Sequence, residues 1–322
     1  MRFARAQFAC IAAALLAALS AAAQQTYPTR PIHVVVPFGA GSSTDQLARA
    51  LAQTITEATK QPVIVEPRPG ANGFIGVQAV ANAVPDGYTV LFGSSATHGI
   101  NAYLYKNVPY DPVKDFTPVT TLSRGAFILA VNPMSPATTL QQLIQRAKAE
   151  PGKVSIGTGT PGTRLAGELL QQRSGAQFLH VPYKTIPAAI NDLLGGQVDL
   201  TIADGGILLP MVNGGKLRAL AVSGTSRWES LPDVPTVQEG GVPGYEATYW
   251  TAAWLPAKAP PAVVSRLNEL LVRAVKAPAA QRFFHASSIE SFTMSPDELG
   301  EFQIAQSEAM RRLVKAAGIV PE

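Results

Sequence analysis

Short apolar runs alternate with amphipathic stretches along most of this chain. Ile32–Val36 is a continuous, mostly β-branched run, which is typical of a parallel strand buried on both faces. In the stretch that follows, Leu47, Leu51 and Ile55 recur every fourth residue and would form one apolar stripe on a helix. The pattern therefore predicts a strand at 32–36 and a helix that begins near Thr44.

The same alternation continues to the end of the chain, and a second round of it begins near residue 126. Further strands are predicted at 63–65, 89–92, 127–131, 154–156, 177–181, 198–203, 217–222 and 247–255. Further helices are predicted at 76–83, 139–149, 165–172 and 186–194, and over most of 261–316. Strands that alternate with helices at this spacing indicate a parallel α/β sheet rather than a sandwich.

The loop between the first strand and the first helix consists of small and hydroxyl residues. Small residues let a ligand approach the backbone, while hydroxyls and helix N-terminal amides offer hydrogen-bond donors to an anion. Thr44 and Asp45 are expected to cap the helix and hold the shape of the loop. The predicted anion loop comprises Phe38, Gly39, Ala40, Gly41, Ser42, Ser43 and Thr44.

A second loop of this kind follows the strand at 89–92. It contains Ser94, Ser95, Thr97 and His98, and the carboxyl ends of parallel strands are where open sheets bind ligands. His98 could donate a hydrogen bond to a bound anion or could pack the loop. Both interpretations stay open from the sequence.

Residues 157–162 spell G-x-G-x-x-G between a predicted strand and a predicted helix. A dinucleotide site also needs an acidic residue about 20 positions later, at the end of the next strand. The first acid after that strand is Asp192, inside a predicted helix, and Pro161 interrupts the motif. Thr158, Gly159 and Thr160 are therefore interpreted as a small-anion loop, with a plain turn as the alternative.

Three further residues are candidates for contact with an anionic ligand. Arg164 lies at the start of a predicted helix, where the helix dipole disfavours a cation, so it either faces an anion or is solvated. Lys184 follows a predicted strand end and allows the same two interpretations. Tyr183, next to it, either contacts the ligand or caps the end of the strand.

The first residues are typical of a secretory signal peptide. Arg2 and Arg5 form the charged region, 8–19 the apolar region and 21–23 the cleavage site. The apolar run is shorter than the 18 or so residues that a membrane span needs. Cys10 lies inside this segment, so the mature chain is expected to contain no disulfide, thiolate metal site or thiol nucleophile.

Composition excludes several classes of function. The chain has 26 Lys and Arg against 22 Asp and Glu. Removal of the two signal arginines leaves a net charge of about +2, which is no footprint for nucleic acid or anionic lipid. No nucleic-acid partner is therefore expected. No metal or cofactor is expected either, because the sequence lacks a metal-ligand spacing and the context of a dinucleotide site. The mature length favours two domains rather than one.

Catalytic motifs are missing from the sequence. The histidines are scattered, without the spacing of a metal site, and no G-x-S-x-G elbow is present. These histidines are His33, His98, His180 and His285. A binding protein without catalysis is the favoured interpretation. The alternative is an exported α/β hydrolase-like enzyme that uses Ser94 or Ser95 with His98.

Motifs spread along almost the whole mature chain give it a family resemblance. They are 35–38 (VVPF), 68–71 (RPGA), 85–89 (PDGYT), 97–101 (THGIN), 108–112 (VPYDP), 165–169 (LAGEL), 180–183 (HVPY), 192–199 (DLLGGQVD), 215–220 (GKLRAL) and 231–236 (LPDVPT). With these motifs the chain resembles the periplasmic solute-binding proteins of tripartite tricarboxylate transporters, the Bug family.

The resemblance implies a fold like that of type II periplasmic binding proteins, with two α/β domains, a ligand cleft and two hinge crossovers. It implies a signal peptide at 1–23, a first domain at 24–125 plus 249–322, and a second domain at 126–248. Loops 38–44 and 94–98 would grip a carboxylate. Loops 158–164 and 203–205, with Asp204, would contact the rest of the solute on closure.

The chain departs from the family pattern where specificity is expected. Ser42 follows Gly41 where two glycines are common, and Arg164 stands at a position that is frequently histidine. Lys184 replaces a common glycine, and Ala203 replaces a frequent aspartate, with Asp204 next to it. The ligands of other members therefore do not transfer to this chain.

The expected function is periplasmic capture of a small organic carboxylate by a monomer that delivers it to the large and small membrane subunits of a transporter. Some members of the family inform a sensor kinase instead. That alternative also stays open from the sequence.

Overall fold

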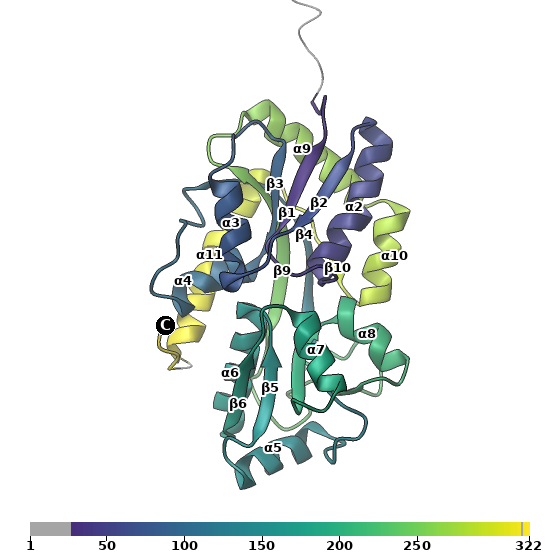
Figure 1. Cartoon of the computed structure of the whole chain (residues 1–322), viewed down its shortest axis with the longest axis vertical. Helices are drawn as coiled ribbons and strands as arrows, with labels where there is room; N and C mark the ends of the chain where they lie inside the picture. Colours follow the sequence, from purple (N-terminus) through teal and green to yellow (C-terminus); the bar gives the residue numbers. More distant parts are fainter. Residues whose placement is uncertain (1–26, 317) are drawn as a thin grey trace, which may run out of the picture.

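Strand β4 (Phe116–Val131) is shared by the two halves of the molecule. The computed structural model describes residues 27–316 and 318–322 (Figure 1). The predicted signal peptide at 1–23 lies outside these residues. The two lobes in Figure 1 lie at opposite ends of β4, which runs from the upper lobe into the lower one.

The upper lobe contains the first and the last parts of the described chain. Its first elements are β1 (Ile32–Val36), α2 (Ser43–Thr59), β2 (Val63–Pro67), a 3-10 turn η1 (Ala71–Gly73), α3 (Phe74–Ala81), β3 (Thr89–Ser94), a π-helical turn η2 (Ala96–Ile100) and α4 (Asn101–Leu104). Its last elements are β9 (Thr248–Pro256), α9 (Pro261–Val275), α10 (Pro278–Ser287), β10 (Glu290–Ser291) and α11 (Pro296–Ala316).

The lower lobe contains the middle of the chain. Its elements are α5 (Leu140–Ala149), β5 (Val154–Thr158), α6 (Pro161–Ser174), β6 (Phe178–Pro182), α7 (Ile186–Leu194), β7 (Leu200–Asp204), α8 (Gly205–Asn213) and β8 (Arg218–Val222). Each strand and helix predicted for this part of the chain is present, with ends shifted by a few residues.

Strand directions bring the loops of the two lobes together. The sheet order is β2-β1-β3-β9-β4-β7-β5-β6. β3 is antiparallel to β9, and β9 is antiparallel to β4, so β1 and β3 run in the direction of β4. β7 is antiparallel to β4, and β5 is parallel to β7. The carboxyl ends of β1 and β3 therefore face those of β5 and β7 across the junction.

The partners of β4 change between Ala126 and Phe127. Up to Ala126 it pairs with β9, and from Phe127 onward it pairs with β7. Most side chains of this strand are buried, so it serves as a core strand in both lobes.

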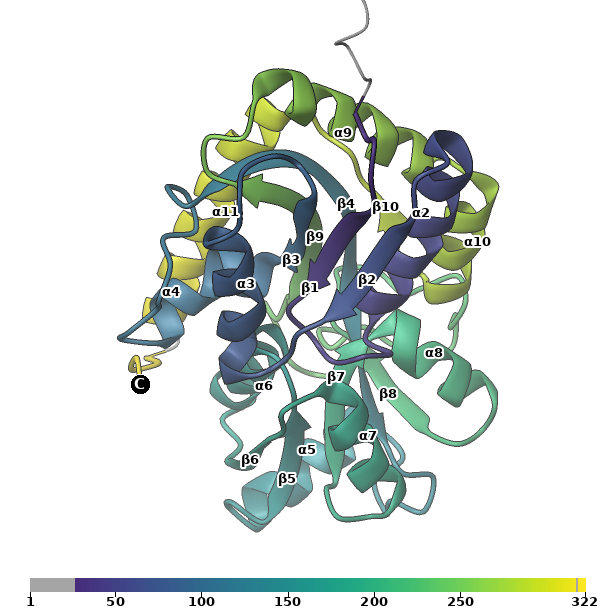
Figure 2. The same cartoon turned by 45° about the horizontal axis from the view of Figure 1, so that its top comes forward.

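Both faces of the sheet are covered by helices in each lobe (Figure 2). In the upper lobe Val34 and Val36 pack with the helices α2 and α9 on one face, while Val35 packs with α3 and α11 on the other. In the lower lobe Leu129 faces α5 and α6, and Ile128 faces α7 and α8. The apolar run at 32–36 is thus a parallel strand buried on both faces, as predicted.

One predicted boundary differs in a way that matters for the site. The helix predicted at 165–172 begins four residues earlier, at Pro161, with Thr160 as its N-cap. Thr160 and Thr163 exchange hydrogen bonds as a capping box, and proline is favoured in the first turn. The apolar stripe of a helix does not mark its polar first turn.

We expect Leu129→Ala to lower the free energy of unfolding by about 2–5 kcal/mol, because Leu129 is fully buried and truncation leaves a cavity. Urea denaturation followed by tryptophan fluorescence measures the change. Met134→Ala is the control, since Met134 is 89% exposed and its loss should change stability by less than about 0.5 kcal/mol. Equal effects of the two substitutions would contradict the assignment of β4 as a core strand.

Candidate functional site

A cavity of about 50 Å³ lies between the two lobes, next to the junction of β4 and β9. Both lobes contribute to its wall, and the lining residues are Phe38, Ser42, Thr44, Ser94, Ser95, Ala96, Phe127, Thr160, Gly162, Ile186, Asp204, Ile207, Tyr249 and Thr251. Sites for small molecules usually measure roughly 300–1,000 Å³. The cavity in this structure is therefore smaller than a usual small-molecule site.

Four helices begin at this cavity. Ser42 is the N-cap of α2 and Thr160 that of α6, Ile186 is the first residue of α7, and Asp204 precedes α8. A helix N-terminus carries partial positive charge and unpaired N–H groups. No lysine or arginine is among the residues that line the cavity. The site can therefore stabilise an anion without a cationic side chain.

The α2 loop is held in shape by Asp45. Its carboxylate accepts a hydrogen bond from the Gly41 N–H at 2.9 Å and pairs with Arg49 at 3.0 Å. Gly41 adopts a positive φ of 77°, which favours glycine there. Ser42, rather than Thr44, accepts the capping bond, from the Asp45 N–H at 3.3 Å. Asp45 therefore shapes the loop, as predicted.

Two aliphatic hydroxyls on the cavity wall are free to bind a ligand. Within residues 27–316 and 318–322, the hydroxyls of Thr44 and Ser95 form no hydrogen bond, although both side chains are largely buried. The neighbouring Ser94 hydroxyl accepts the Ala96 N–H at 3.1 Å. Thr44 and Ser95 are thus the hydroxyls most readily offered to a solute.

Asp204 contributes an acid from the lower lobe. Its side chain makes no capping bond to α8. Instead its Oδ1 accepts a hydrogen bond from the Ser43 hydroxyl of the upper lobe, so the contact spans the cleft. Burial raises the pKa of Asp204 to about 7.

Tyr249, at the start of β9, lies on the wall beside Asp204. Its hydroxyl is buried and has no hydrogen-bond partner among the described residues. Burial, and after it the negative charge of Asp204, raise the pKa of this phenol well above its usual value. Tyr249 therefore presents a neutral O–H donor.

His98 points away from the cavity. The ring is completely buried, stacks on Trp254 at a centroid distance of 3.8 Å, and bonds through Nδ1 to Thr97 Oγ1 at 2.9 Å. Burial lowers the pKa of His98 to about 3. In the described part of the chain neither Ser94 nor Ser95 hydrogen-bonds to it. The packing interpretation of His98 is the one that this structure supports.

The other predicted residues lie around the cavity rather than in its wall. Gly159 and Tyr183 line a neighbouring hollow of about 250 Å³, together with Lys184, and the Tyr183 hydroxyl donates to Asp192 at 2.6 Å. Arg164 is turned toward Glu322, with 2.7 Å between Nη2 and Oε1. Those that do not line the cavity are Gly39, Ala40, Gly41, Ser43, Thr97, His98, Thr158, Gly159, Arg164 and Tyr183.

Several cavity residues lie outside the loops predicted from the sequence. They are Phe127, Ile186, Ile207, Tyr249 and Thr251, whereas Ala96 and Gly162 lie within the predicted loops 94–98 and 158–164. Phe127, Tyr249 and Thr251 lie inside buried strands, where an apolar run does not distinguish a core position from a cavity wall. Ile186 and Ile207 lie in the first turns of α7 and α8, each of which comes after a strand. Their position after a strand end was the one feature of the sequence that could have identified them as cavity residues.

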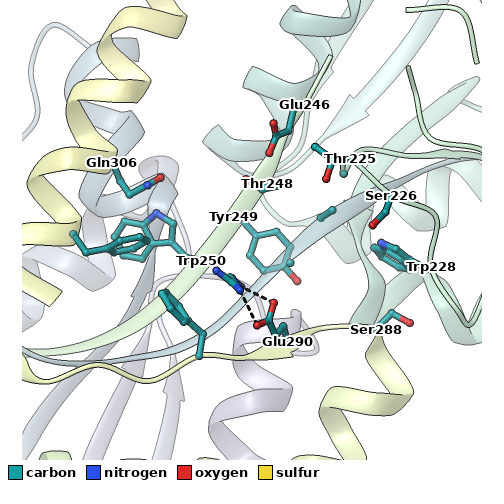
Figure 3. Close-up of a pocket in the computed structure, with 16 residues that line it drawn as sticks. Thr225, Ser226, Trp228, Glu246, Thr248, Tyr249, Trp250, Ser288, Glu290 and Gln306 are labelled. Atoms are coloured by element: carbon teal, nitrogen blue, oxygen red, sulfur yellow. Dashed lines mark hydrogen bonds and ion pairs between the residues drawn. The ribbon is translucent and has the colours of Figure 1, made fainter. Parts of the chain in front are cut away.

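A larger hollow of about 480 Å³ lies next to Tyr249 (Figure 3). It contains Arg124, whose guanidinium makes a bidentate ion pair with Glu290, with both hydrogen bonds 2.8 Å long. Glu246 adds a second acid to the wall. Both partners of this ion pair are more than half exposed. No helix begins among the residues that line this hollow, whereas four helices begin at the cleft cavity, so the cleft cavity is the better candidate for an anion.

In residues 27–316 and 318–322, no helix has both the length and the hydropathy that a bilayer span requires. Within the same ranges, no three His, Cys, Asp or Glu side chains lie close enough together to hold a metal ion.

The chain is similar to known proteins over most of its length. The family model described as tripartite tricarboxylate transporter family receptor matches residues 47–319. A UPF0065 protein of Bordetella bronchiseptica is 37% identical over 96% of this chain and 92% of its own length. Protein BugT of Bordetella pertussis is 36% identical over 91% of both chains.

Solved structures agree with these relatives. Rpa4515 of R. palustris, described with adipate, has a TM-score of 0.89 and 32% identity, over 92% of this chain and 100% of that one. MatC of Rhodopseudomonas palustris, described with bound malate, has a TM-score of 0.83 and 26% identity, over 89% and 100%. The predicted fold class is thereby confirmed.

The buried His98 makes stability depend on pH. The pKa of His98 is lower in the folded protein than in the unfolded chain. Below about pH 6.5 the unfolded chain therefore takes up a proton that the folded protein does not, and the free energy of unfolding falls as pH falls toward 3. Between pH 6.5 and 5 the wild type should lose about 1.4 kcal/mol per pH unit more than His98→Phe, which keeps a ring on Trp254. Urea denaturation across this range tests it, and parallel curves for the two proteins would contradict it.

Proposed function

Because the chain belongs to the tripartite tricarboxylate transporter receptor family, whose members are periplasmic solute-binding proteins, we propose that it captures a small organic carboxylate for such a transporter. The proposed route is export by the segment 1–23, capture in the periplasm as a monomer, and delivery to membrane subunits. The observation that carries the proposal is the meeting of four helix N-termini at a cation-free cavity.

The binding affinity expected for this site suits reversible capture of a solute. Hydrogen bonds to a charged group contribute about 1.5–3 kcal/mol each, and a helix terminus about 0.3–1 kcal/mol. Four bonds and two termini thus reach about 7–14 kcal/mol before the cost of association. Micromolar affinity needs about 8 kcal/mol. The hydroxyls of Thr44 and Ser95 and the N-termini of α2 and α6 are the proposed donors.

We also propose that the two lobes are domains that close over the solute. Their proposed limits are 24–125 plus 249–322 and 126–248, with β4 and the approach to β9 as hinges. Two contacts would form on closure, Ser43 with Asp204 and Gly39 with Thr185. A Cβ on Gly39 would lie 2.6 Å from Thr185 Cγ2, so a larger residue there would keep the lobes apart.

A hydrolytic function has less support. A serine nucleophile needs a base within hydrogen-bond reach, and His98 is bonded to Thr97 and stacked on Trp254 instead. The family and the fold are those of solute-binding proteins.

Thermal-shift and calorimetric titration against mono- and dicarboxylates, adipate and malate included, tests the proposal. A carboxylate at 100 times its Kd should stabilise the folded protein by about 2.7 kcal/mol. The recovered solute should be chemically unchanged by NMR. Folded protein that no organic anion stabilises, or a solute that is turned over, would refute the proposal.

We expect Ser95→Ala and Thr44→Val each to weaken carboxylate binding by about tenfold or more, since each removes one hydrogen bond to a charged group. Isothermal titration calorimetry measures the change. Ser265→Ala on the exposed side of α9 is the matched control and should leave affinity unchanged. If both variants bind as tightly as this control, the cavity is not the carboxylate site.

A further inference from the structure

Asp204 is an acid inside a site that is built for an anion. It stands at the end of β7, its partly buried side chain lines the cavity between the lobes, and no Lys, Arg or His of the described chain forms an ion pair with it. A carboxylate solute and an ionised Asp204 would repel each other in this desolvated space.

The groups that face Asp204 are neutral. Ser43 of α2 donates to its Oδ1, Tyr249 of β9 lies beside it with an unpartnered hydroxyl, and Phe127 of β4 is its strand partner. Ile186 of α7 and Ile207 of α8 complete the wall.

Charged side chains on the surrounding elements are engaged elsewhere. Asp45 of α2 pairs with Arg49, Arg124 of β4 with Glu290, and Arg164 of α6 with Glu322. On α10 the ionisable residues Arg282 and His285 are exposed. The helix α8 itself contains no ionisable side chain.

We propose that closure over an anionic solute takes up one proton from solvent at Asp204, so that the lower lobe offers the solute two neutral O–H donors, Asp204 and Tyr249. Because Oδ1 accepts from Ser43, Oδ2 carries the proton. The proposal rests on the proposed function, since it assumes that an anion occupies the cleft. It assigns to the site a solute whose far end is a hydrogen-bond acceptor, such as a second carboxylate, and excludes a far-end ammonium group.

The sign of the pH dependence follows from burial. In the open form Asp204 is solvated and ionises in its usual range, whereas in the closed form burial raises its pKa to about 7 and outweighs the lowering by a backbone hydrogen bond. The closed form therefore binds more protons. Closure is favoured at low pH and becomes less favourable as pH rises toward 7.

A disulfide across the cleft tests the proton without any solute. A Cβ on Gly39 lies 2.9 Å from Thr185 Cβ, so Gly39→Cys with Thr185→Cys needs a shift of about 1 Å to reach disulfide geometry. Cys10, in the predicted signal peptide, is the chain's one native cysteine. The carboxyl ¹³C resonance of Asp204 is assigned by its loss in Asp204→Asn. This resonance should titrate near pH 7 in the oxidised protein, which the disulfide locks closed, and below about pH 5 in the reduced protein. A midpoint below pH 5 in the locked form overturns the proposal.

Calorimetry with adipate and malate tests the linkage to binding. In buffers of different ionisation enthalpy at pH 6.5, the wild type should take up close to one proton per solute and Asp204→Asn close to none. Wild-type affinity should fall at least fivefold from pH 6 to 7.5, while that of Asp204→Asn stays within about threefold. Both proteins experience the same ionisation of the solute, so the difference between them reports Asp204.

The role of the phenol is tested by Tyr249→Phe, which should weaken binding about tenfold and leave proton uptake unchanged. Unaltered affinity would remove Tyr249 from the site. The proposal would be overturned if Asp204→Asn lost binding and wild-type affinity rose with pH. That result would show that Asp204 is ionised and pairs with a cation. If neither dicarboxylate binds any variant, the choice of solute fails, and the locked protein still decides whether Asp204 holds the proton.

Discussion

The continuity of β4 through both lobes is the constraint on which the rest of the structure depends. Because one buried strand pairs with β9 at one end and with β7 at the other, the two sheets share a single backbone. The directions of the paired strands then turn the carboxyl ends of β1, β3, β5 and β7 toward one another. The loops that could bind a ligand, and the helices that begin from them, therefore all lie at the junction of the two lobes.

This arrangement explains how the proposed anion site could lack a basic residue. Each βα unit ends a strand and starts a helix at the junction, so partial positive charges and free N–H groups gather there from both lobes. Hydroxyls supply the remaining donors. A fixed cation would add strength, but a solute that must be released again needs only moderate affinity. Asp204 adds an acid to this positive environment, and our proposal links its protonation to occupancy of the site.

The limits of sequence reasoning are visible at particular residues. The apolar run at 32–36 and the stripe of Leu47, Leu51 and Ile55 report burial directly, and the structure confirms the strand and the helix. His98 was open between ligand contact and packing, because its position after a strand fits both. Arg164 was open between anion and solvent, and its actual partner, Glu322, lies 158 residues away in sequence. No local pattern encodes such a contact.

By itself the sequence determined the α/β class, the order of the strands and helices, the small-residue loops at strand ends and the family. These features depend on periodicity, turn chemistry and extended motifs, all of which are local along the chain. Only the tertiary structure decided which loop residues share a cavity, that His98 faces the core, and that Ser43, Asp204 and Tyr249 meet across the cleft. Such contacts depend on strand direction and side-chain orientation in three dimensions, which bring together residues that are far apart in the sequence.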